Sequence, residues 1–472
     1  MISRDGNVNT EKNLRRTILG AVTAFVLCMA SVFTGCMENH ISPYESGTSL
    51  DAESFDADPF VTDWFETIAQ GAKKSPEFAD PIAARAYAYI SIALYESLRS
   101  GYSDKPPALS TVLLECPSFP QADSTKRYHW LVVANSAIAG VAKHMFRYAP
   151  ADVQNELVTR ENSVYDGFQR RFSDDNALRR SVEFGKTLAQ AINAYADADG
   201  GGRYEQNPYA TEFVPTSDAS CWQPSNSDGK SLLSQWGSIR PFLVRRSEIK
   251  EQLDPGPFPS FSTKQGSLFF KEAVDTYTRY TSLRPEDRAA IEFWGDEATS
   301  DRALSTHMIT LVARLMRGQS YSVRFASDVF VRLALGMADA SIATYRVKYT
   351  YPLIRPSTYL SQHANPSIKP DGVFDNIFVP PCPEFCSTFM AMSESACSVL
   401  NGFFPADVKI TDRWKTSSSQ SERGFSGFSN MLAEIRATQY GNGSQYAFSV
   451  EAGSKIGTNV SAIYSQRFPV RR

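Results

Sequence analysis

Two basic side chains in the last third of the sequence have the types and the spacing needed to hold a small anion. Lys348 and Arg355 are separated by six residues, and Pro356 follows the arginine. A guanidinium is a planar fork for bidentate hydrogen bonds, whereas an ammonium is a compact point charge, so together they suit a tetrahedral oxyanion. The alternative is that Lys348 only meets the dipole at a helix C-terminus and that Arg355 is a surface residue.

Histidine, the side chain that would add catalysis to such a site, is absent beyond this region. The sequence has five histidines, and the last of them is His363. An imidazole changes its charge or offers a nitrogen lone pair near neutral pH, which amides and hydroxyls do not. His363 and Cys386 are therefore the candidate replacement nucleophiles. A nearby cation would lower the pKa of the Cys386 thiol, but the sequence supplies no general base for it.

The pattern Lys-x6-Arg-Pro at 348–356 resembles the first motif of the type-2 phosphatidic acid phosphatase and vanadium haloperoxidase superfamily. In that family a Pro-Ser-Gly-His motif and a Ser-Arg-x5-His motif follow, and the site binds phosphate or vanadate. One histidine attacks phosphorus or binds vanadium, and the other handles the proton on the leaving group. The resemblance implies that the chain keeps the anion-binding part of this site.

The two histidine motifs are degenerate in this sequence. Residues 380–389 read Pro-Pro-Cys-Pro-Glu-Phe-Cys-Ser-Thr-Phe, so Ser387 matches the motif serine and the Gly-His-x triplet is missing. Gln439 stands where the arginine of the third motif belongs, and Gln445 stands where its histidine belongs. Amides can hydrogen-bond an oxyanion but cannot carry protons, and Ser387 could equally be a helix N-cap. The resemblance thus implies an oxyanion site without catalytic histidines, composed of Lys348, Arg355, Ser387, Gln439 and Gln445.

The resemblance extends along most of the chain and implies an all-α fold. We expect a single large helical bundle of the vanadium haloperoxidase and acid phosphatase type. Arg85, Tyr89 and Tyr95 are expected to pack or form hydrogen bonds inside it. A fold carries no activity without its site, so function is a separate question. Segments that match the haloperoxidase-like bacterial branch occur in the family's order at residues 85–96, 194–200, 221–224, 285–294 and 338–348.

Apolar periodicity and helix-start residues support that architecture. Asp58-Pro59 and Asp80-Pro81 each place a carboxylate before proline, which predicts two capped helix starts. Residues 200–265 are rich in Pro, Ser, Gly and Trp and are predicted to form a long ordered loop around the bundle. His307 is expected to be a structural residue, and few strands are expected. Further helices are predicted near 126–147, 151–170, 177–197, 266–280, 285–295, 302–317, 322–347, 388–402, 426–438 and 447–462.

The N-terminus is typical of a bacterial lipoprotein. Lys12, Arg15 and Arg16 precede an apolar run over 17–33, and Gly35-Cys36 follows. This predicts a signal peptide at 1–35, a lipid anchor on Cys36, a flexible tether at 36–55 and a haloperoxidase-like helical domain at 56–472. The anchor would hold the protein on a membrane outside the cytoplasm, in the cell envelope. A plain signal peptide and a single anchor helix are the alternatives.

Charge and cysteine content narrow the partners further. The net charge of −3 and the lack of a long basic cluster argue against a nucleic-acid partner. Five cysteines would remain after cleavage and lipidation, an odd number, and Cys382 with Cys386 is a candidate disulfide. Metal binding by this pair is disfavoured because no histidine or second cysteine pair lies at ligand spacing. The remaining cysteines are Cys116, Cys221, Cys382, Cys386 and Cys397.

Three functions remain open from the sequence. The favoured one is a cell-envelope lipoprotein that has lost catalysis and uses the old pocket for a ligand or serves as an interaction protein. No cofactor is expected beyond phosphate or vanadate in a surviving pocket. The second is a working haloperoxidase or phosphoesterase with a relocated nucleophile. The third is a surface protein that captures a protein partner through residues 200–265.

Overall fold

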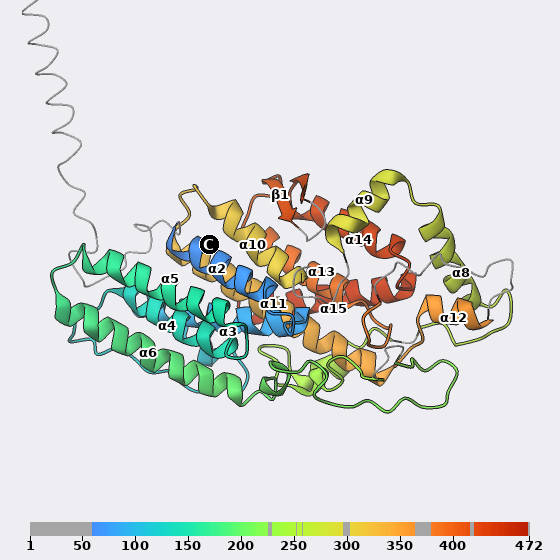
Figure 1. The fold of residues 1–472 in the computed structure, drawn as a ribbon, viewed down its shortest axis with the longest axis horizontal. Coiled ribbons are helices and arrows are strands. Elements are labelled where there is room, and N and C mark those ends of the chain that lie inside the picture. The colour runs from blue at the N-terminus through green and yellow to red at the C-terminus, as the bar shows by residue number, and fades with distance from the viewer. Residues whose placement is uncertain are drawn as a thin grey trace, which may run out of the picture. The chain divides into compact units, whose positions relative to one another are not determined.

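The computed structural model describes residues 59–224, 229–251, 253–256, 258–295, 303–363, 379–415 and 420–470. The predicted signal peptide, Cys36 and the tether lie outside these residues. Thr48–Arg472 form one compact unit. The regular elements of its described part are helices apart from one short hairpin, which confirms the predicted all-α fold (Figure 1). None of the helices found there is both long enough and apolar enough to cross a membrane.

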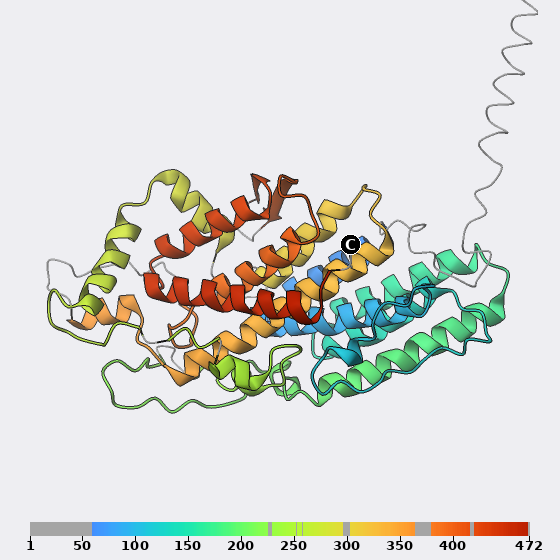
Figure 2. The same ribbon diagram turned by 180° about the vertical axis from the view of Figure 1, so that it is seen from behind.

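The helices of the first half surround α4. This helix packs against α3, α5 and α6, while α2 packs against α5 and α10 (Figures 1 and 2). The predicted helices near 126–147, 151–170 and 177–197 are confirmed as α4, α5 and α6. The helices of this half are α2 (Phe60–Lys73), α3 (Asp80–Arg99), α4 (Trp130–Met145), α5 (Ala151–Gln169) and α6 (Asp175–Asp197), with a 3-10 turn at Leu109–Thr111.

The second half is organised around α11, which packs against α3, α13 and α15. The predicted helices are again confirmed, but α12 was not predicted, because eight residues beginning with proline carry little periodicity. The helices are α8 (Leu268–Thr281), α9 (Pro285–Trp294), α10 (Leu304–Met316), α11 (Val323–Thr350), α12 (Pro356–His363), α13 (Thr388–Asn401), α14 (Phe428–Gly441) and α15 (Ala447–Arg467).

Helix α11 is buried along most of its length and starts at a side-chain cap. The Ser322 hydroxyl accepts a hydrogen bond from the Phe325 amide at 3.1 Å, which satisfies one of the free N–H groups of the first turn. Close packing on α13 depends on Gly336, because a Cβ at this position would lie 2.8 Å from the Ser395 hydroxyl. This contact fixes the helix whose last turn carries Lys348.

The prediction that Asp80 caps the helix that follows it, α3, is wrong. Asp80 is itself the first residue of α3, and its side chain does not cap that helix. Its carboxylate instead accepts hydrogen bonds from the amides of Leu304 and Ser305, at 3.1 and 2.9 Å, and so caps α10. A carboxylate in this position stabilises the N-terminus of a helix more than 200 residues away in sequence. Asp58, the other predicted cap, lies outside the described residues.

The expected internal role of Arg85 is confirmed. The side chain is 1% exposed, and its Nε and Nη1 lie 2.6 Å from Asp199 and 2.7 Å from Glu205. The Tyr89 hydroxyl donates a hydrogen bond to the same Asp199 carboxylate at 2.8 Å. This network joins α3 to the segment that follows α6.

Residues 200–265 are mostly irregular where the structure describes them. Their regular elements are 3-10 turns at Gly202–Tyr204 and Trp236–Ser238 and the short helix α7 (Arg246–Glu251). The segment packs on α11 through Trp236, which is buried and donates a hydrogen bond from its indole to the Ser341 hydroxyl at 3.1 Å. Asp339 of α11 accepts hydrogen bonds from three successive amides of this segment, at residues 242–244.

A two-stranded antiparallel hairpin was not predicted. It consists of β1 (Lys409–Lys415) and β2 (Gln420–Ser426). Ile410, Asp412 and Trp414 alternate on the buried face of β1, and the aspartate in the middle hides the apolar alternation. His307 of α10 meets this aspartate, with Nε2 and Oδ2 2.8 Å apart, which confirms the expected structural role of the histidine.

Candidate functional site

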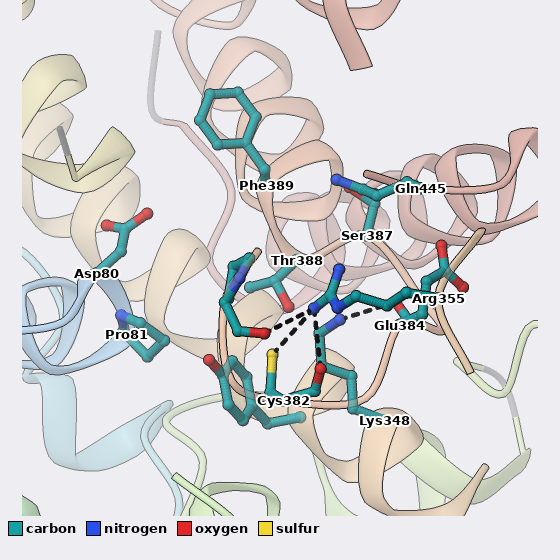
Figure 3. Close-up of a pocket in the computed structure, with 12 residues that line it drawn as sticks. Asp80, Pro81, Lys348, Arg355, Cys382, Glu384, Ser387, Thr388, Phe389 and Gln445 are labelled. Atoms are coloured by element: carbon teal, nitrogen blue, oxygen red, sulfur yellow. Dashed lines mark hydrogen bonds between the residues drawn. The ribbon is translucent and has the colours of Figure 1, made fainter. Parts of the chain in front are cut away.

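A small cavity of about 60 Å³ lies at the position of the degenerate motifs. Lys348 reaches it from the last turn of α11, Arg355 from the residue before α12, and Ser387 from the residue before α13 (Figure 3). Gln445 reaches it from the connection between α14 and α15. The cavity is lined by Asp80, Pro81, Tyr345, Lys348, Arg355, Pro380, Cys382, Glu384, Ser387, Thr388, Phe389 and Gln445.

The five residues proposed for an oxyanion site therefore come together in space. Four of them line the cavity, and the fifth, Gln439, is buried on α14 behind Gln445. The amide nitrogen of Gln445 donates a hydrogen bond to the Gln439 side-chain oxygen at 3.0 Å. Gln439 thus orients Gln445 instead of lining the cavity itself.

Lys348 is held by main-chain oxygens of the second motif. Its ammonium donates hydrogen bonds to the carbonyls of Pro383 and Glu384, both at 3.0 Å, and the residue is 5% exposed. An ammonium has three donors, so these two contacts leave one for another acceptor. Part of the positive charge is therefore committed to holding the 380–384 segment.

Arg355 is engaged with the same segment. Its Nη2 donates hydrogen bonds to the carbonyls of Pro380 and Cys382, at 3.1 and 2.9 Å, and Nη1 donates to Ser444 at 3.4 Å. The Nε group is buried and has no hydrogen-bond partner within the described chain. Both cations thus hold the backbone in place and keep spare donor capacity.

Ser387 is both a helix cap and a cavity residue. Its hydroxyl accepts a hydrogen bond from the Met390 amide at 3.1 Å, and its own amide donates to the Ser449 carbonyl at 3.0 Å. The chain passes close to α15 here, because a Cβ at Gly453 would lie 2.3 Å from the Ser387 carbonyl oxygen. The helix-cap alternative for Ser387 is therefore confirmed, while the oxyanion role stays a prediction.

Glu384 is a site residue that the sequence reasoning did not single out, although it lies inside the motif run. Its carboxylate accepts hydrogen bonds from the Tyr446 amide at 2.9 Å and from the Ser449 hydroxyl at 2.6 Å. Complete burial raises the pKa of this carboxyl to about 7, against the opposing effects of the Ser449 hydrogen bond and the Lys348 charge. The cavity wall therefore carries an acid that changes charge near neutral pH.

Neither candidate nucleophile lines the cavity. His363 ends α12 and packs against Phe261 and Tyr359. Cys386 is fully buried, and this burial raises the pKa of its thiol to about 12, the opposite of the lowering expected from nearby cations. The thiol that does line the cavity is Cys382.

The proposed disulfide between Cys382 and Cys386 is not formed. All five cysteines in the described residues are free thiols. The same part of the chain contains no group of three or more His, Cys, Asp or Glu side chains placed to hold a metal ion. Thr388 and Asp80 are further polar residues of the lining. Thr388 directly follows Ser387 in the second motif, whereas Asp80 could not be found from the motif spacing because only the fold brings it to the cavity.

Comparison with known proteins identifies the fold. Residues 328–469 match the family model described as the VCPO second helical-bundle domain. The chain is similar to the crystal structure of the first bacterial vanadium-dependent iodoperoxidase, with a TM-score of 0.75 and 22% identity over 87% of this chain and 96% of that one. It is also similar to a holo-type bacterial vanadium-dependent chloroperoxidase, with a TM-score of 0.59 and 15% identity over 84% and 95% of the two chains. The apo-type chloroperoxidase gives a TM-score of 0.59 and 13% identity over 83% and 94%.

The chain has the fold of the bacterial vanadium haloperoxidases, and its C-terminal part matches the second-domain model. Both findings support the superfamily resemblance seen in the motifs. Among curated proteins, none is significantly similar in sequence to the chain.

The cavity fits an oxyanion better than it fits ligated vanadium. No histidine is among the twelve residues that line it, so the nitrogen ligand of the haloperoxidase motif has no counterpart there. Lys348, Arg355 and Gln445 are hydrogen-bond donors and can bind an oxyanion without coordinating a metal. The donors in this lining therefore suit electrostatic binding of an oxyanion, and the lining offers no imidazole to coordinate vanadium.

Proposed function

We propose that this chain is a non-catalytic member of the vanadium haloperoxidase-like superfamily that binds a small oxyanion without turning it over. One observation carries the proposal: the cavity at the family's site keeps Lys348 and Arg355 but has no imidazole in its lining. Arg355 Nε and one ammonium donor of Lys348 are left for a ligand once the contacts to the main chain are counted. A group that only donates hydrogen bonds can bind phosphate, but it has no lone pair with which to attack phosphorus or to accept a proton.

We further propose that the protein acts in the cell envelope. The support is the sequence at the N-terminus, where an apolar run over 17–33 precedes Gly35-Cys36. Lipid chains on Cys36 would place the helical unit and its cavity on a membrane surface outside the cytoplasm. A labelled fatty acid fed to the cells should be incorporated into the wild-type chain and not into Cys36→Ala. Incorporation into both would contradict the lipid anchor on Cys36.

A second candidate function is the capture of a partner through the 200–265 segment. The observation that favours it is a hollow of about 470 Å³ lined by residues 215–219, 221–223, Ile354 and two polar residues of α12, Thr358 and Gln362. Its volume is in the range of small-molecule and peptide-side-chain sites. Thr358→Arg, at the wall of this hollow, should then abolish partner capture and leave oxyanion binding unchanged, and unchanged partner capture would overturn this second candidate.

Thermal unfolding across a phosphate titration tests the main proposal. A ligand that binds only the folded state stabilises it by RT ln(1 + [L]/Kd), about 2.7 kcal/mol at a hundredfold excess over Kd. We expect the full chain in detergent to gain stability with phosphate or vanadate, and Lys348→Ala/Arg355→Ala to gain none. His363→Ala, outside the cavity, is the matched control and should respond like the wild type.

Equilibrium dialysis with labelled phosphate keeps the test valid if the double variant folds poorly. Binding by the wild-type chain supports the proposal, and its absence at millimolar phosphate overturns it. Halide oxidation or phosphoester cleavage by the wild type above the level of the double variant would overturn the loss of catalysis.

A further inference from the structure

The cavity contains a thiol that the oxyanion proposal does not use. Cys382 lines the cavity, is 2% exposed, and its Sγ accepts a hydrogen bond from Arg355 Nη2 at 3.6 Å. Figure 3 shows the sulfur facing the guanidinium. A guanidinium beside a thiol favours the thiolate, which is the reactive form of cysteine.

The surroundings of the other thiols are different. Burial raises the pKa of Cys116 to about 12 and also that of Cys386 to about 12, and neither residue lines the cavity. Cys116 is the more exposed of the two, so it is the natural internal comparison for reactivity. Among the described cysteines, Cys382 is the one with a hydrogen bond from a cation.

Two polar atoms next to this thiol lack partners within the described chain. Arg355 is 4% exposed, and its Nε has no hydrogen-bond partner. The Thr388 hydroxyl oxygen is likewise buried and without a partner, and Figure 3 shows it on the side of the guanidinium. Buried polar atoms are nearly always paired, so these two point to a small polar ligand in the cavity.

A phenol is a further neighbour of the sulfur. The Tyr345 hydroxyl lines the cavity and interacts with Cys382, and burial holds its pKa well above the ordinary value for tyrosine. It therefore stays protonated and can act as a donor. The cavity volume of about 60 Å³ exceeds the roughly 10–15 Å³ that one water needs, so a molecule of a few heavy atoms can enter.

We propose that Cys382 is a peroxide-reactive thiol and that the cavity receives hydrogen peroxide or a small alkyl hydroperoxide beside Arg355 and Thr388. The Cys382 thiolate attacks one peroxide oxygen, and the sulfur–oxygen bond forms as the oxygen–oxygen bond breaks. The sulfur loses two electrons and the peroxide gains them. The other oxygen leaves as water or an alcohol, carrying the proton that the thiol gave up, and Cys382 becomes a sulfenic acid.

Arg355 and Thr388 have separate roles in this reaction. The guanidinium stabilises the thiolate before the attack and the negative charge that develops on the leaving oxygen during it. The Thr388 hydroxyl can accept a hydrogen bond from the peroxide or donate one to it. The modification consumes one peroxide per Cys382. It goes beyond the proposed oxyanion binding and does not depend on it, because no bound oxyanion takes part.

Site-resolved trapping of sulfenic acid tests the proposal on the full chain in detergent. The protein is treated with one equivalent of hydrogen peroxide for a series of times and is then unfolded in urea with dimedone, because dimedone is too large for a cavity of about 60 Å³. Each cysteine is quantified by peptide mass spectrometry. We expect Cys382 to be oxidised at least about tenfold faster than Cys116 in the same molecules, because its sulfur faces the cavity and accepts a hydrogen bond from Arg355, whereas burial raises the pKa of the Cys116 thiol to about 12. Equal rates, or faster labelling of Cys116, would overturn the proposal without any variant having to fold.

Variants then assign the roles. Cys382→Ser should remove the fast label, and Thr388→Val should slow it by about three- to tenfold while the melting temperature stays within a degree or two. Cys116→Ser is the matched control and should leave the rate at Cys382 unchanged. A fast label that survives Cys382→Ser would place the reactive thiol elsewhere. Fast labelling of Cys382 in a protein that binds no phosphate would show that this inference holds when the oxyanion proposal fails.

Discussion

The ammonium of Lys348 donates a hydrogen bond to the main-chain carbonyl of Glu384 at 3.0 Å, so the first family motif holds the second one in place. The Glu384 carboxylate accepts hydrogen bonds from the Tyr446 amide and the Ser449 hydroxyl. A single residue of the 380–384 segment therefore connects α11 with the start of α15. The same contacts that keep the cavity in shape limit how many donors it can offer to a ligand.

Replacing Glu384 by glutamine should change how stability depends on pH. The pKa of Glu384 is raised to about 7 in the folded state from an ordinary value of 4.5, so the folded protein holds this proton when the unfolded chain has lost it. Stability then falls as pH rises from about 4.5 to 7, by up to about 3 kcal/mol from this group. Glu384→Gln should flatten the upper part of that slope, as measured by urea unfolding at several pH values.

Asp339 provides the internal reference for that experiment. Burial raises its pKa to about 6, against hydrogen bonds from three amides and from Tyr464. Its contribution to stability is lost over a lower range, between about pH 4 and 6, by the same linkage. The Glu384 variant should keep this lower slope, and an unchanged slope between pH 6 and 7 would contradict the assignment.

Replacing Lys348 by methionine should destabilise the protein even without any ligand. Methionine keeps the length of the side chain but leaves the buried carbonyls of Pro383 and Glu384 without their donor. Each unsatisfied buried carbonyl costs on the order of 1–3 kcal/mol, so we expect a loss of about 3 kcal/mol in the free energy of unfolding. Lys455→Met, at an exposed position of α15, is the control and should change it by less than about 0.5 kcal/mol.

The placement of Lys348 and Arg355 at one cavity could be predicted because their pattern is local. Lys348 and Arg355 are held at one cavity by a helix end and the short turn after it, which the spacing and Pro356 already indicate. Cys382 could not be distinguished from Cys386 as the cavity thiol, because four residues of irregular chain do not determine which side chain faces inward. Asp80 was assigned to its own helix, since nothing in the sequence connects it with α10.

The hairpin of β1 and β2 is another feature that the sequence could not predict. Aspartate at the centre of a short strand is unfavourable by propensity, and only the partner on α10 makes its burial acceptable. That partner, His307, is about 100 residues earlier in the chain. Periodicity finds elements whose buried face is apolar, and it does not find a strand that is held by a buried ion pair or hydrogen bond.

Replacing Arg85 by methionine should be among the most destabilising changes outside the cavity. The guanidinium is 1% exposed and contacts both Asp199 and Glu205, so its loss removes the cation that these two buried carboxylates share. Asp199 then keeps the Tyr89 hydroxyl and Glu205 keeps Arg147, which is only partly exposed. Removing one member of a buried ion pair costs about 3–5 kcal/mol. Arg284→Met is the matched control, because its partner Asp287 lies on the surface and exposed pairs contribute little to stability. Similar losses in the two variants would show that the buried network has no special weight.

The contact between His307 and Asp412 should behave as a coupled pair. His307 is 2% exposed and stacks between Trp294 and Trp414, at ring distances of 5.0 and 4.1 Å, and its Nε2 lies 2.8 Å from the Asp412 carboxylate. Replacing His307 by leucine leaves a buried carboxylate without a hydrogen bond, and we expect a loss of about 3 kcal/mol. Replacing both residues by leucine removes both polar groups, so the double variant should lose less than the His307 variant alone. Urea unfolding followed by tryptophan fluorescence measures His307→Leu, Asp412→Leu and the double variant, and the two tryptophans beside the pair report on this region directly. His144→Leu, at a partly exposed pair with Asp197, is the control and should cost less than about 1 kcal/mol. If the double variant instead loses the sum of the two single losses, the pair is not coupled, and the aromatic stacking of His307 would account for the position of the hairpin.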